Sequence, residues 1–408
     1  MPIAFAREML VAGGGIGGLA AALACNRAGW RARVFERAAA FSEVGAGLQL
    51  GPNATRVLQQ WGLSDALRRN AFFPDWIGIR NAHDDRQLTR MPLGDDIASR
   101  YGAPYATLHR ADLHGLLLEA VRQTGETVLH LGSEAGPAQV CSGAVGLAGR
   151  REDDRSVASE GDALVVADGL WSVLRQQVEP DAGPPGATGH FAWRTLIDRA
   201  TLTAAQNAAC AGVNVWMGPR LHVVAYPVRR GELLNLVVLA ERRPGMAGEP
   251  GEPQDWNIDV APAEVALVLS GCSPLLQSLA EAAPQWRRWM LHDRPPVAGP
   301  GALASGRVAL LGDAAHPMLP YLAQGAAMAL EDAAELQRTL GMDIDDVNAS
   351  LARYALHRWQ RVGQVQARAR RQSEIFHATG PVRWARDAAL TLMGRRLLDQ
   401  PWLWGERP

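Results

Sequence analysis

The chain has 408 residues, more than one ordinary core requires and fewer than three domains need. Its 41 basic and 42 acidic residues nearly cancel, so it lacks the net charge with which proteins attract nucleic acid or an anionic membrane. Every basic residue is arginine, which excludes Schiff-base chemistry on lysine and a lysine-containing phosphate loop.

Other classes of protein are disfavoured by the distribution of residues. No stretch approaches the roughly 20 apolar residues that span a bilayer, and the first residues lack the pattern of a secretion signal. Four scattered cysteines and ten histidines without close ligand spacing predict no metal site. We therefore expect a cytoplasmic protein that acts on small molecules, without a nucleic-acid partner or stable membrane association.

The first specific motif lies at the N-terminal end. A short apolar strand at 9–12 runs into the segment GGGIGG and then into an Ala-rich helix. This is the G-x-G-x-x-G pattern in its strand-turn-helix setting, where the three glycines permit a tight turn, close approach of a pyrophosphate and helix packing. These glycines are Gly13, Gly15 and Gly18.

The next strand ends on an acid, Glu36, about 20 residues beyond the glycines, where a carboxylate can accept hydrogen bonds from an adenosine ribose. Together these features predict a dinucleotide site. No second G-x-G-x-x-G follows a strand elsewhere in the sequence. The absence of a separate nicotinamide motif favours FAD as the resident dinucleotide.

The middle of the chain changes character. Four strand-like runs are separated by Gly, Pro and Arg turns and predict an antiparallel sheet: 190–197, 213–217, 221–228 and 232–240. His222 and Tyr226 lie four residues apart in the third run, so both side chains project from the same face of that strand. They either contact a substrate or simply occupy a half-buried strand.

A second junction lies at 308–332, VALLGDAAHPMLPYLAQGAAMALED. An apolar run stops on Gly312 and Asp313, passes two prolines and restarts as a helix. The N-terminus of that helix, near Gln324, offers unpaired N–H groups and a partial positive charge that can compensate an anion.

On these motifs the chain resembles the single-component FAD-dependent aromatic hydroxylases of the p-hydroxybenzoate hydroxylase fold, in the salicylate, 3-hydroxybenzoate and 6-hydroxynicotinate branch. The resemblance covers roughly residues 8 to 375. Its motifs are the glycine loop with Glu36, the segment ADGLWSVLR that begins at Ala167, and Gly312-Asp313. It implies an α/β fold in which a Rossmann-like FAD-binding domain carries an inserted antiparallel-sheet substrate domain and C-terminal helices.

The resemblance also implies a division of the chain and roles for cofactor-binding residues. The expected parts are 1–180 and 296–345 for FAD, 181–295 for the substrate sheet and 346–408 for the C-terminal helices. Further FAD contacts are implied for five residues: Arg110 near the phosphate and ribityl region, Asp168 in the second motif, Asp313 at the ribityl chain, and Gly325 and Ala326 at the flavin pyrimidine ring.

The activity that the resemblance implies is a monooxygenase reaction. NADH or NADPH reduces FAD, and O2 then forms a flavin C4a-hydroperoxide that hydroxylates a small aromatic acid. The expected catalytic residues are His222, Tyr226 and Tyr321, and Gln49 and Pro320 join them in binding the substrate. The expected assembly is a monomer or homodimer, and no metal is assigned.

Some positions depart from the nearest branches, so the identity of the aromatic ring stays open. Gln49 and Tyr321 stand where 6-hydroxynicotinate hydroxylases carry histidines, and Ala225 stands where 3-hydroxybenzoate enzymes tend to carry one. An FAD-dependent oxidase or a redox-regulated flavin-binding protein without coupled hydroxylation is the alternative. His316 is assigned to the loop scaffold, and the Arg-rich run 353–371 is read as an amphipathic helix with a solvated basic face.

Overall fold

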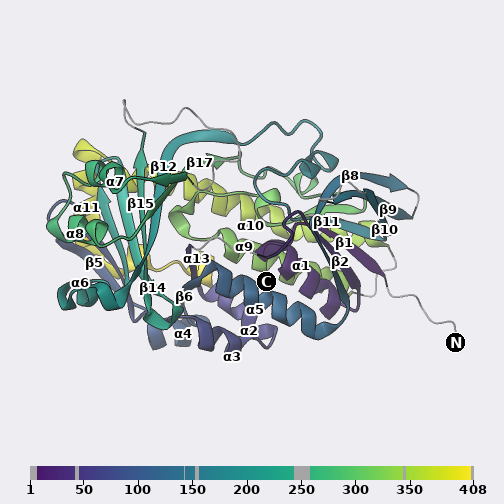
Figure 1. Cartoon of the computed structure of the whole chain (residues 1–408), viewed down its shortest axis with the longest axis horizontal. Helices are drawn as coiled ribbons and strands as arrows, with labels where there is room; N and C mark the ends of the chain where they lie inside the picture. The colour runs from purple at the N-terminus through teal and green to yellow at the C-terminus, as the bar shows by residue number, and fades with distance from the viewer. Residues whose placement is uncertain are drawn as a thin grey trace.

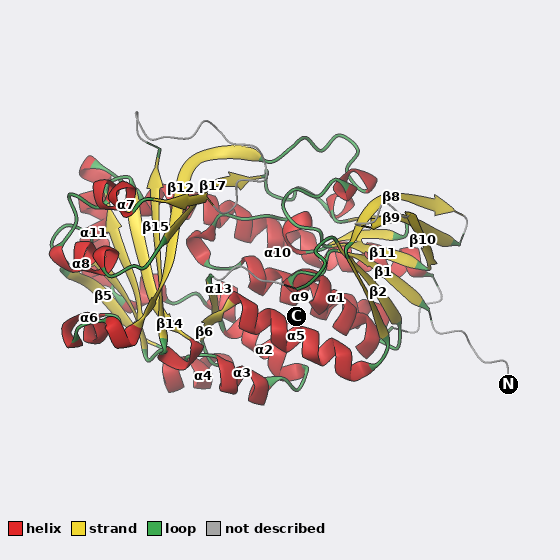
Figure 2. Cartoon of the chain, viewed as in Figure 1, coloured by secondary structure: helices red, strands yellow, loops and turns green. Residues whose placement is uncertain are grey.

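Two sheets lie at opposite ends of the molecule, and helices α9 and α10 lie between them (Figure 1). The computed structural model describes residues 7–41, 46–141, 143–151, 156–242, 258–342 and 346–405. Figure 2 shows the same arrangement by secondary structure, with the larger sheet on the left and the smaller one on the right.

The smaller of these two sheets contains the strands of the three motifs. All its neighbouring pairs are parallel except the edge pair β18–β19. Its central strands are the most apolar, with all four residues of β11 and all three of β19 buried, because helices cover the middle of the sheet. The order is β18 (Ala304–Ser305), β19 (Val308–Leu310), β11 (Ala163–Val166), β1 (Glu8–Ala12), β2 (Arg31–Glu36) and β7 (Thr127–Leu131).

Four helices pack around this sheet and on one another. The Ala- and Gly-rich helix α1 is buried along most of its length because α9 and α5 both pack on it. These helices are α1 (Ile16–Arg27), α5 (Arg110–Thr124), α9 (Gly325–Leu340) and α10 (Val347–Phe376).

The larger sheet has eight strands. On β14, Val223 and Ala225 face a second core beneath α7 and α8, whereas Tyr226 belongs to the core shared with the FAD-binding part. The alternation of a strand therefore places His222 and Tyr226 on the face opposite that second core. The order is β16 (Ile258–Val260), β17 (Trp286–Asp293), β12 (Gly186–Asp198), β15 (Leu233–Glu241), β14 (Leu221–Val228), β13 (Val213–Gly218), β4 (Trp76–Asn81) and β5 (Gln87–Pro92).

The other elements are short. The small sheets are β10–β9–β8 and β3–β6, with strands β3 (Gly47–Leu50), β6 (Ala106–His109), β8 (Ser133–Cys141), β9 (Ala144–Arg151) and β10 (Ser156–Gly161). The remaining α-helices are α2 (Pro52–Gln60), α3 (Ser64–Asn70), α4 (Gly94–Tyr101), α6 (Ala204–Ala209), α7 (Pro262–Val268), α8 (Pro274–Glu281), α11 (Gly380–Met393), α12 (Arg395–Leu398) and α13 (Pro401–Trp404). The 3-10 helices are η1 (Leu174–Gln177), η2 (Arg199–Thr201), η3 (Arg229–Gly231), η4 (Pro300–Ala302), η5 (Gly312–Ala314) and η6 (Pro320–Leu322).

The predicted strands of the inserted sheet are confirmed, but two features of the sheet were not foreseen. β4 and β5 lie within the range 1–180 expected for the FAD-binding domain, yet they pair with the larger sheet. That range is therefore interrupted by a hairpin of the substrate part. The pair β13–β4 is parallel, so the sheet is mixed rather than purely antiparallel.

The helix predicted over the Arg-rich run is confirmed as part of α10, but its basic face is not fully solvated. Arg358 and Arg361 are 3% and 6% exposed. Their guanidinium groups pair with two buried acids of α9: Arg358 Nε lies 2.7 Å from Asp332, and Arg361 Nε lies 2.6 Å from Glu331. The sequence placed Arg358 and Arg361 on the solvated face because the carboxylates that pair with them lie on another helix, remote in sequence. Within the described ranges, no helix combines the length and the hydrophobicity needed to cross a bilayer.

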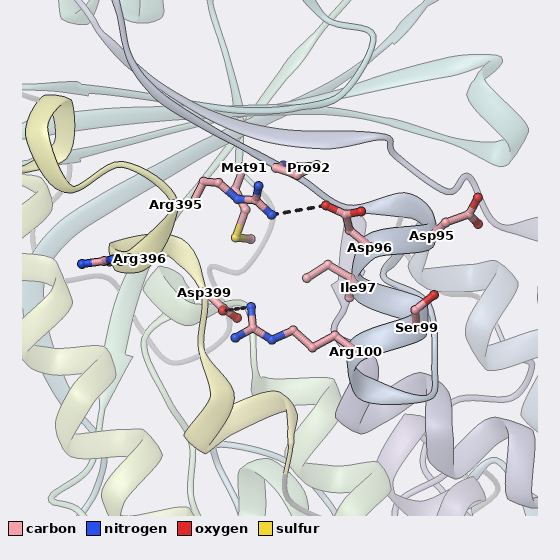
Figure 3. A pocket seen from close by; sticks show the side chains of 10 residues that line it. All are labelled: Met91, Pro92, Asp95, Asp96, Ile97, Ser99, Arg100, Arg395, Arg396 and Asp399. Carbon is pink, nitrogen blue, oxygen red and sulfur yellow. Dashed lines mark hydrogen bonds and ion pairs between the residues drawn. The ribbon is translucent and has the colours of Figure 1, made fainter.

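The C-terminal residues return to α4, where an open cavity of about 660 Å³ separates α4 from α12. Arg395 and Asp96 bridge it at 3.2 Å, and Arg100 pairs with Asp399 (Figure 3). No predicted site residue lines this cavity. It is therefore separate from the site described below.

Candidate active site

The glycine loop joins β1 to α1 with the geometry that a dinucleotide site requires. Gly13 has a φ of 97°, and a Cβ there would lie 2.5 Å from the carbonyl oxygen of Ala167. A Cβ on Gly18 would lie 1.8 Å from the carbonyl oxygen of Gly13. Gly15 is the N-cap residue of α1, and beyond its chain neighbours no described atom lies within 4 Å of its Cβ position. The first N–H groups of α1 are therefore open to a phosphate.

Glu36 ends β2 beside this loop. Its carboxylate oxygens accept hydrogen bonds from the backbone N–H of Gly14 at 2.8 Å and of Ala38 at 2.9 Å. These two bonds fix the carboxylate at the edge of the loop, and each oxygen keeps a second lone pair. At this position the carboxylate can accept hydrogen bonds from ribose hydroxyl groups, which is the role that the sequence predicts.

Asp168 follows β11 on the other side of the glycine loop. Its Cα lies 2.8 Å from the position that a Cβ on Gly13 would occupy. One carboxylate oxygen, Oδ1, is buried and has no hydrogen-bond partner among the described residues. Burial raises the pKa of Asp168 to about 6, although a hydrogen bond from Ser172 lowers it. The unpaired Oδ1 oxygen at this position is suited to a cofactor group that donates a hydrogen bond.

Replacing Asp168 by asparagine is expected to stabilise the FAD-free protein and to weaken FAD binding. Because the folded-state pKa lies above the roughly 3.9 of an unfolded aspartate, stability falls as pH rises from about 4 to about 6. D168N removes that loss, worth about 3 kcal/mol at pH 7. Urea unfolding of the FAD-free protein at several pH values measures it. Equal pH slopes for both proteins would contradict the assignment.

The third motif places Asp313 beside the start of α9. The Oδ1 atom of Asp313 lies 3.8 Å from the position that a Cβ on Gly325 would occupy. Gln324 caps α9 without a side-chain hydrogen bond, so the N–H groups of Gly325 and Ala326 have no partner within the helix. A carboxylate and a helix N-terminus therefore face the same space, as the sequence predicts.

Arg110 is half-buried at the first position of α5. One turn further along the same face, His114 Nε2 lies 2.8 Å from the carbonyl oxygen of Gly14. Arg110 also lies next to β3, since its N–H donates to Ala46 O at 2.8 Å. The helix thus carries Arg110 alongside the glycine loop, where a guanidinium can meet a phosphate.

His316 holds the loop of the third motif. Its Nε2 atom lies 2.5 Å from Asp332 Oδ2, which also accepts the N–H of Gly312 at 3.1 Å. Both side chains are buried. The assignment of His316 to the loop scaffold agrees with these contacts.

The predicted substrate residues form two groups. Tyr226 packs against β3, where a Cβ on Gly47 would lie 2.6 Å from its ring. Gln49 accepts a hydrogen bond from the hydroxyl of Tyr105 at 2.8 Å and is also hydrogen-bonded to Tyr226. Tyr105 is a member of this group that the sequence did not reveal.

The second group surrounds His222 and Tyr321, whose ring centroids lie 5.0 Å apart. The Nδ1 atom of His222 lies 2.8 Å from the Nε2 atom of His377, and Phe376 contacts both His222 and Tyr321 edge-on. His190 completes the group at 5.1 Å from the ring of His377. These three additional residues come from β12 and the end of α10, and no local sequence signal identifies them.

Burial sets the protonation of this second group. It lowers the pKa of His222 well below the ordinary value, helped by the neighbouring His377 and His190. It raises the pKa of Tyr321 above its ordinary range. The hydroxyl of Tyr321 is buried and has no hydrogen-bond partner in the part of the chain described. This second group therefore offers a neutral histidine and an unpaired neutral hydroxyl, both able to hydrogen-bond a ligand.

Pro320 differs in burial from the other predicted substrate residues. It begins η6 and is exposed, whereas Tyr321 beside it is buried. Its contact with a substrate stays a prediction, as do the individual substrate roles of Gln49, His222, Tyr226 and Tyr321.

The residues present fit FAD. The acids and glycines that follow β1, β2, β11 and β19 gather at the carboxyl edge of one parallel sheet, where α/β proteins bind nucleotides. The buried unpaired oxygen of Asp168 and the open N-termini of α1 and α9 supply the required acceptor and donors. This combination defines an FAD-binding flavoprotein.

The chain belongs to the family described as FAD binding domain, whose sequence model matches residues 7–369. It is 36% identical over 380 residues to a 3-hydroxybenzoate 6-hydroxylase of Polaromonas naphthalenivorans (strain CJ2), covering 93% of this chain and 90% of that protein. It is 34% identical to a 6-hydroxynicotinate 3-monooxygenase of Bordetella bronchiseptica (strain ATCC BAA-588 / NCTC 13252 / RB50), covering 88% and 89%. A solved salicylate hydroxylase substrate complex matches with a TM-score of 0.81 and 25% identity over 98% and 96% of the two chains. The predicted family, fold and FAD cofactor are confirmed.

Proposed function

We propose that this chain is an FAD-dependent monooxygenase that uses NAD(P)H and O2 to hydroxylate a small aromatic acid of the hydroxybenzoate or salicylate kind. The observation that carries the proposal is the buried pair of His222 and Tyr321, because Tyr321 lies within the same junction, 308–332, as the third motif. Tyr321 lies eight residues beyond Asp313 and four before Gly325, which are the residues assigned to the flavin. The named relatives act on hydroxylated aromatic acids, which supports the same class of substrate.

Bound FAD supplies the redox chemistry with the nicotinamide and oxygen, and the protein must position the ring and exclude water. The apolar contacts of Phe376 and Val224 suit an aromatic ring, and the unpaired hydroxyl of Tyr321 can bond a polar substituent. Neutral His222 can hydrogen-bond the hydroxyl of a phenol at this place.

Replacing Tyr321 by phenylalanine is expected to leave stability unchanged or to raise it by about 1 kcal/mol, because a buried hydroxyl without a partner is removed. Hydroxylation should fall roughly 10- to 100-fold if that hydroxyl bonds the substrate in the reaction. Thermal unfolding and steady-state product formation test the two effects separately. Unchanged turnover would exclude a role for the hydroxyl.

A flavin oxidase or a redox-regulated flavin-binding protein without coupled hydroxylation is the alternative, and one experiment separates the two. The FAD-loaded protein is given NADH or NADPH with hydroxybenzoates, salicylate and hydroxypyridines, while O2 consumption, product mass and hydrogen peroxide are followed. A product heavier by one oxygen with little peroxide supports the proposal. Peroxide without product, across the panel, supports the alternative. The cytoplasmic location and the monomeric or homodimeric state stay predictions.

A further inference from the structure

Three potential metal ligands meet where β12, β15 and the end of α10 come together. His190 and Glu241 are direct partners across the β12–β15 ladder. His377 caps α10, and its carbonyl oxygen accepts the N–H of Arg220 at 3.0 Å. The carbonyl of that same Arg220 accepts the N–H of Glu241 at 3.0 Å. Backbone hydrogen bonds thus fix all three residues relative to one another.

The ligand atoms of these residues converge. One donor atom from each of His190, Glu241 and His377 lies within 4.8 Å of the others, and His377 Nδ1 is 4.0 Å from Glu241 Oε1. Ligands of tetrahedral zinc, at bond lengths near 2.1 Å, lie roughly 3.4 Å apart. An ion would therefore draw the ligand atoms together by up to about 1.4 Å.

In both histidines one ring nitrogen makes no hydrogen bond to any described residue. The Nδ1 atoms of His190 and His377 are buried and have no hydrogen-bond partner among the described residues. His377 is 4% exposed, and its other nitrogen is already bonded to His222. A buried imidazole nitrogen without a partner is disfavoured unless a ligand satisfies it.

We propose that His190, Glu241 and His377 bind a divalent transition metal ion of the zinc class. Two imidazoles and one carboxylate suit zinc and its neighbours rather than magnesium or calcium, which prefer oxygen ligands alone. Glu241 is half-exposed, so an ion can enter from solvent and keep a water ligand. Its second oxygen faces Arg220 at 3.6 Å, which leaves Oε1 for the ion. A search of the sequence for closely spaced metal ligands misses this site, because His190 and His377 lie in widely separated segments.

Ion binding at this site also affects His222, through its hydrogen bond with His377. An ion on Nδ1 of His377 leaves the proton on Nε2, which then donates to Nδ1 of His222 across 2.8 Å. His222 must in turn carry its own proton on Nε2. The ion therefore fixes the tautomer of a predicted substrate residue, and this consequence alone depends on the proposed function.

The test uses FAD-loaded full-length protein freed of metal with a chelator and titrated with Zn²⁺ in a calorimeter. The expected result is one ion per chain and binding at least roughly tenfold weaker in E241Q and in H190N. Glu241 is half-exposed, so E241Q should keep its fold, and the FAD absorbance verifies this. The matched control is H357N, which removes a half-exposed histidine whose Nδ1 lies 2.7 Å from Glu335. No binding by the unaltered protein, equal binding by E241Q, or an equal loss in H357N would overturn the proposal.

Discussion

The G18A variant should be isolated without FAD. A Cβ at this position would lie 1.8 Å from the carbonyl oxygen of Gly13, so either α1 or the glycine loop must shift. Overpacking of this kind costs about 3 kcal/mol, which corresponds to a roughly 100-fold loss of FAD affinity if the displaced loop is the one that binds the pyrophosphate. The absorbance of bound flavin after purification, followed by titration with FAD, measures the loss.

Gly115 provides the matched control for this prediction. It also lies within a helix, α5, but it is exposed, and beyond the backbone of its own helix no described atom lies within 4 Å of its Cβ position. G115A should keep FAD and gain up to about 1 kcal/mol of stability, because alanine favours a helix over glycine. Full flavin content in G18A would show that the loop tolerates the shift and does not hold the pyrophosphate as assigned.

The R358M variant should lose about 3 to 5 kcal/mol of the free energy of unfolding, because it leaves buried carboxylates without their partner. Burial alone would raise the pKa of Asp332, but the charges of His316 and Arg358 hold it at about 2. The acid is therefore ionised in the folded protein, and its compensation depends on Arg358. A loss of this size is a large part of the total stability of a typical domain. Urea unfolding of the FAD-loaded and FAD-free proteins measures it.

Arg353 lies on the same helix and is exposed, so R353M should change stability by less than about 0.5 kcal/mol. R358M should also loosen the third motif, because Asp332 accepts hydrogen bonds from Gly312 and His316. Similar stabilities for R358M and R353M would show that the buried pairs do not support the fold in the way their geometry indicates.

The sequence predicted the FAD cofactor and the strand-loop-helix geometry of the glycine motif because each of these signals is local. Gly13, Gly15 and Gly18 have fixed spacing between a strand and a helix, and Glu36 ends the next strand. Asp168 and Asp313 also follow apolar strands directly. The carboxyl ends of parallel strands meet at one edge of a sheet, so local patterns were enough to place these residues together.

The substrate side was less predictable because tertiary contacts assemble it. His222 bonds His377 from 155 residues away, and Tyr105 reaches Gln49 from the loop before β6. The burial of Arg358 likewise depends on acids of α9, 26 and 27 residues earlier. No periodicity or spacing encodes such pairings, and only the topology of the fold brings them together.

The order of strands in the smaller sheet has a consequence for how the protein is made. β1 and β19 are separated in that sheet by β11 alone, yet they begin at residues 8 and 308 of the chain. At ribosomal rates of roughly 5 to 20 residues per second, β19 is synthesised about 15 to 60 s after β1. Until then the apolar edge of β11 is unpaired, and the larger sheet emerges first in nearly complete form. We therefore expect capture of FAD through the third motif to be a late step of biosynthesis, preceded by a period in which the unpaired edge of β11 favours aggregation.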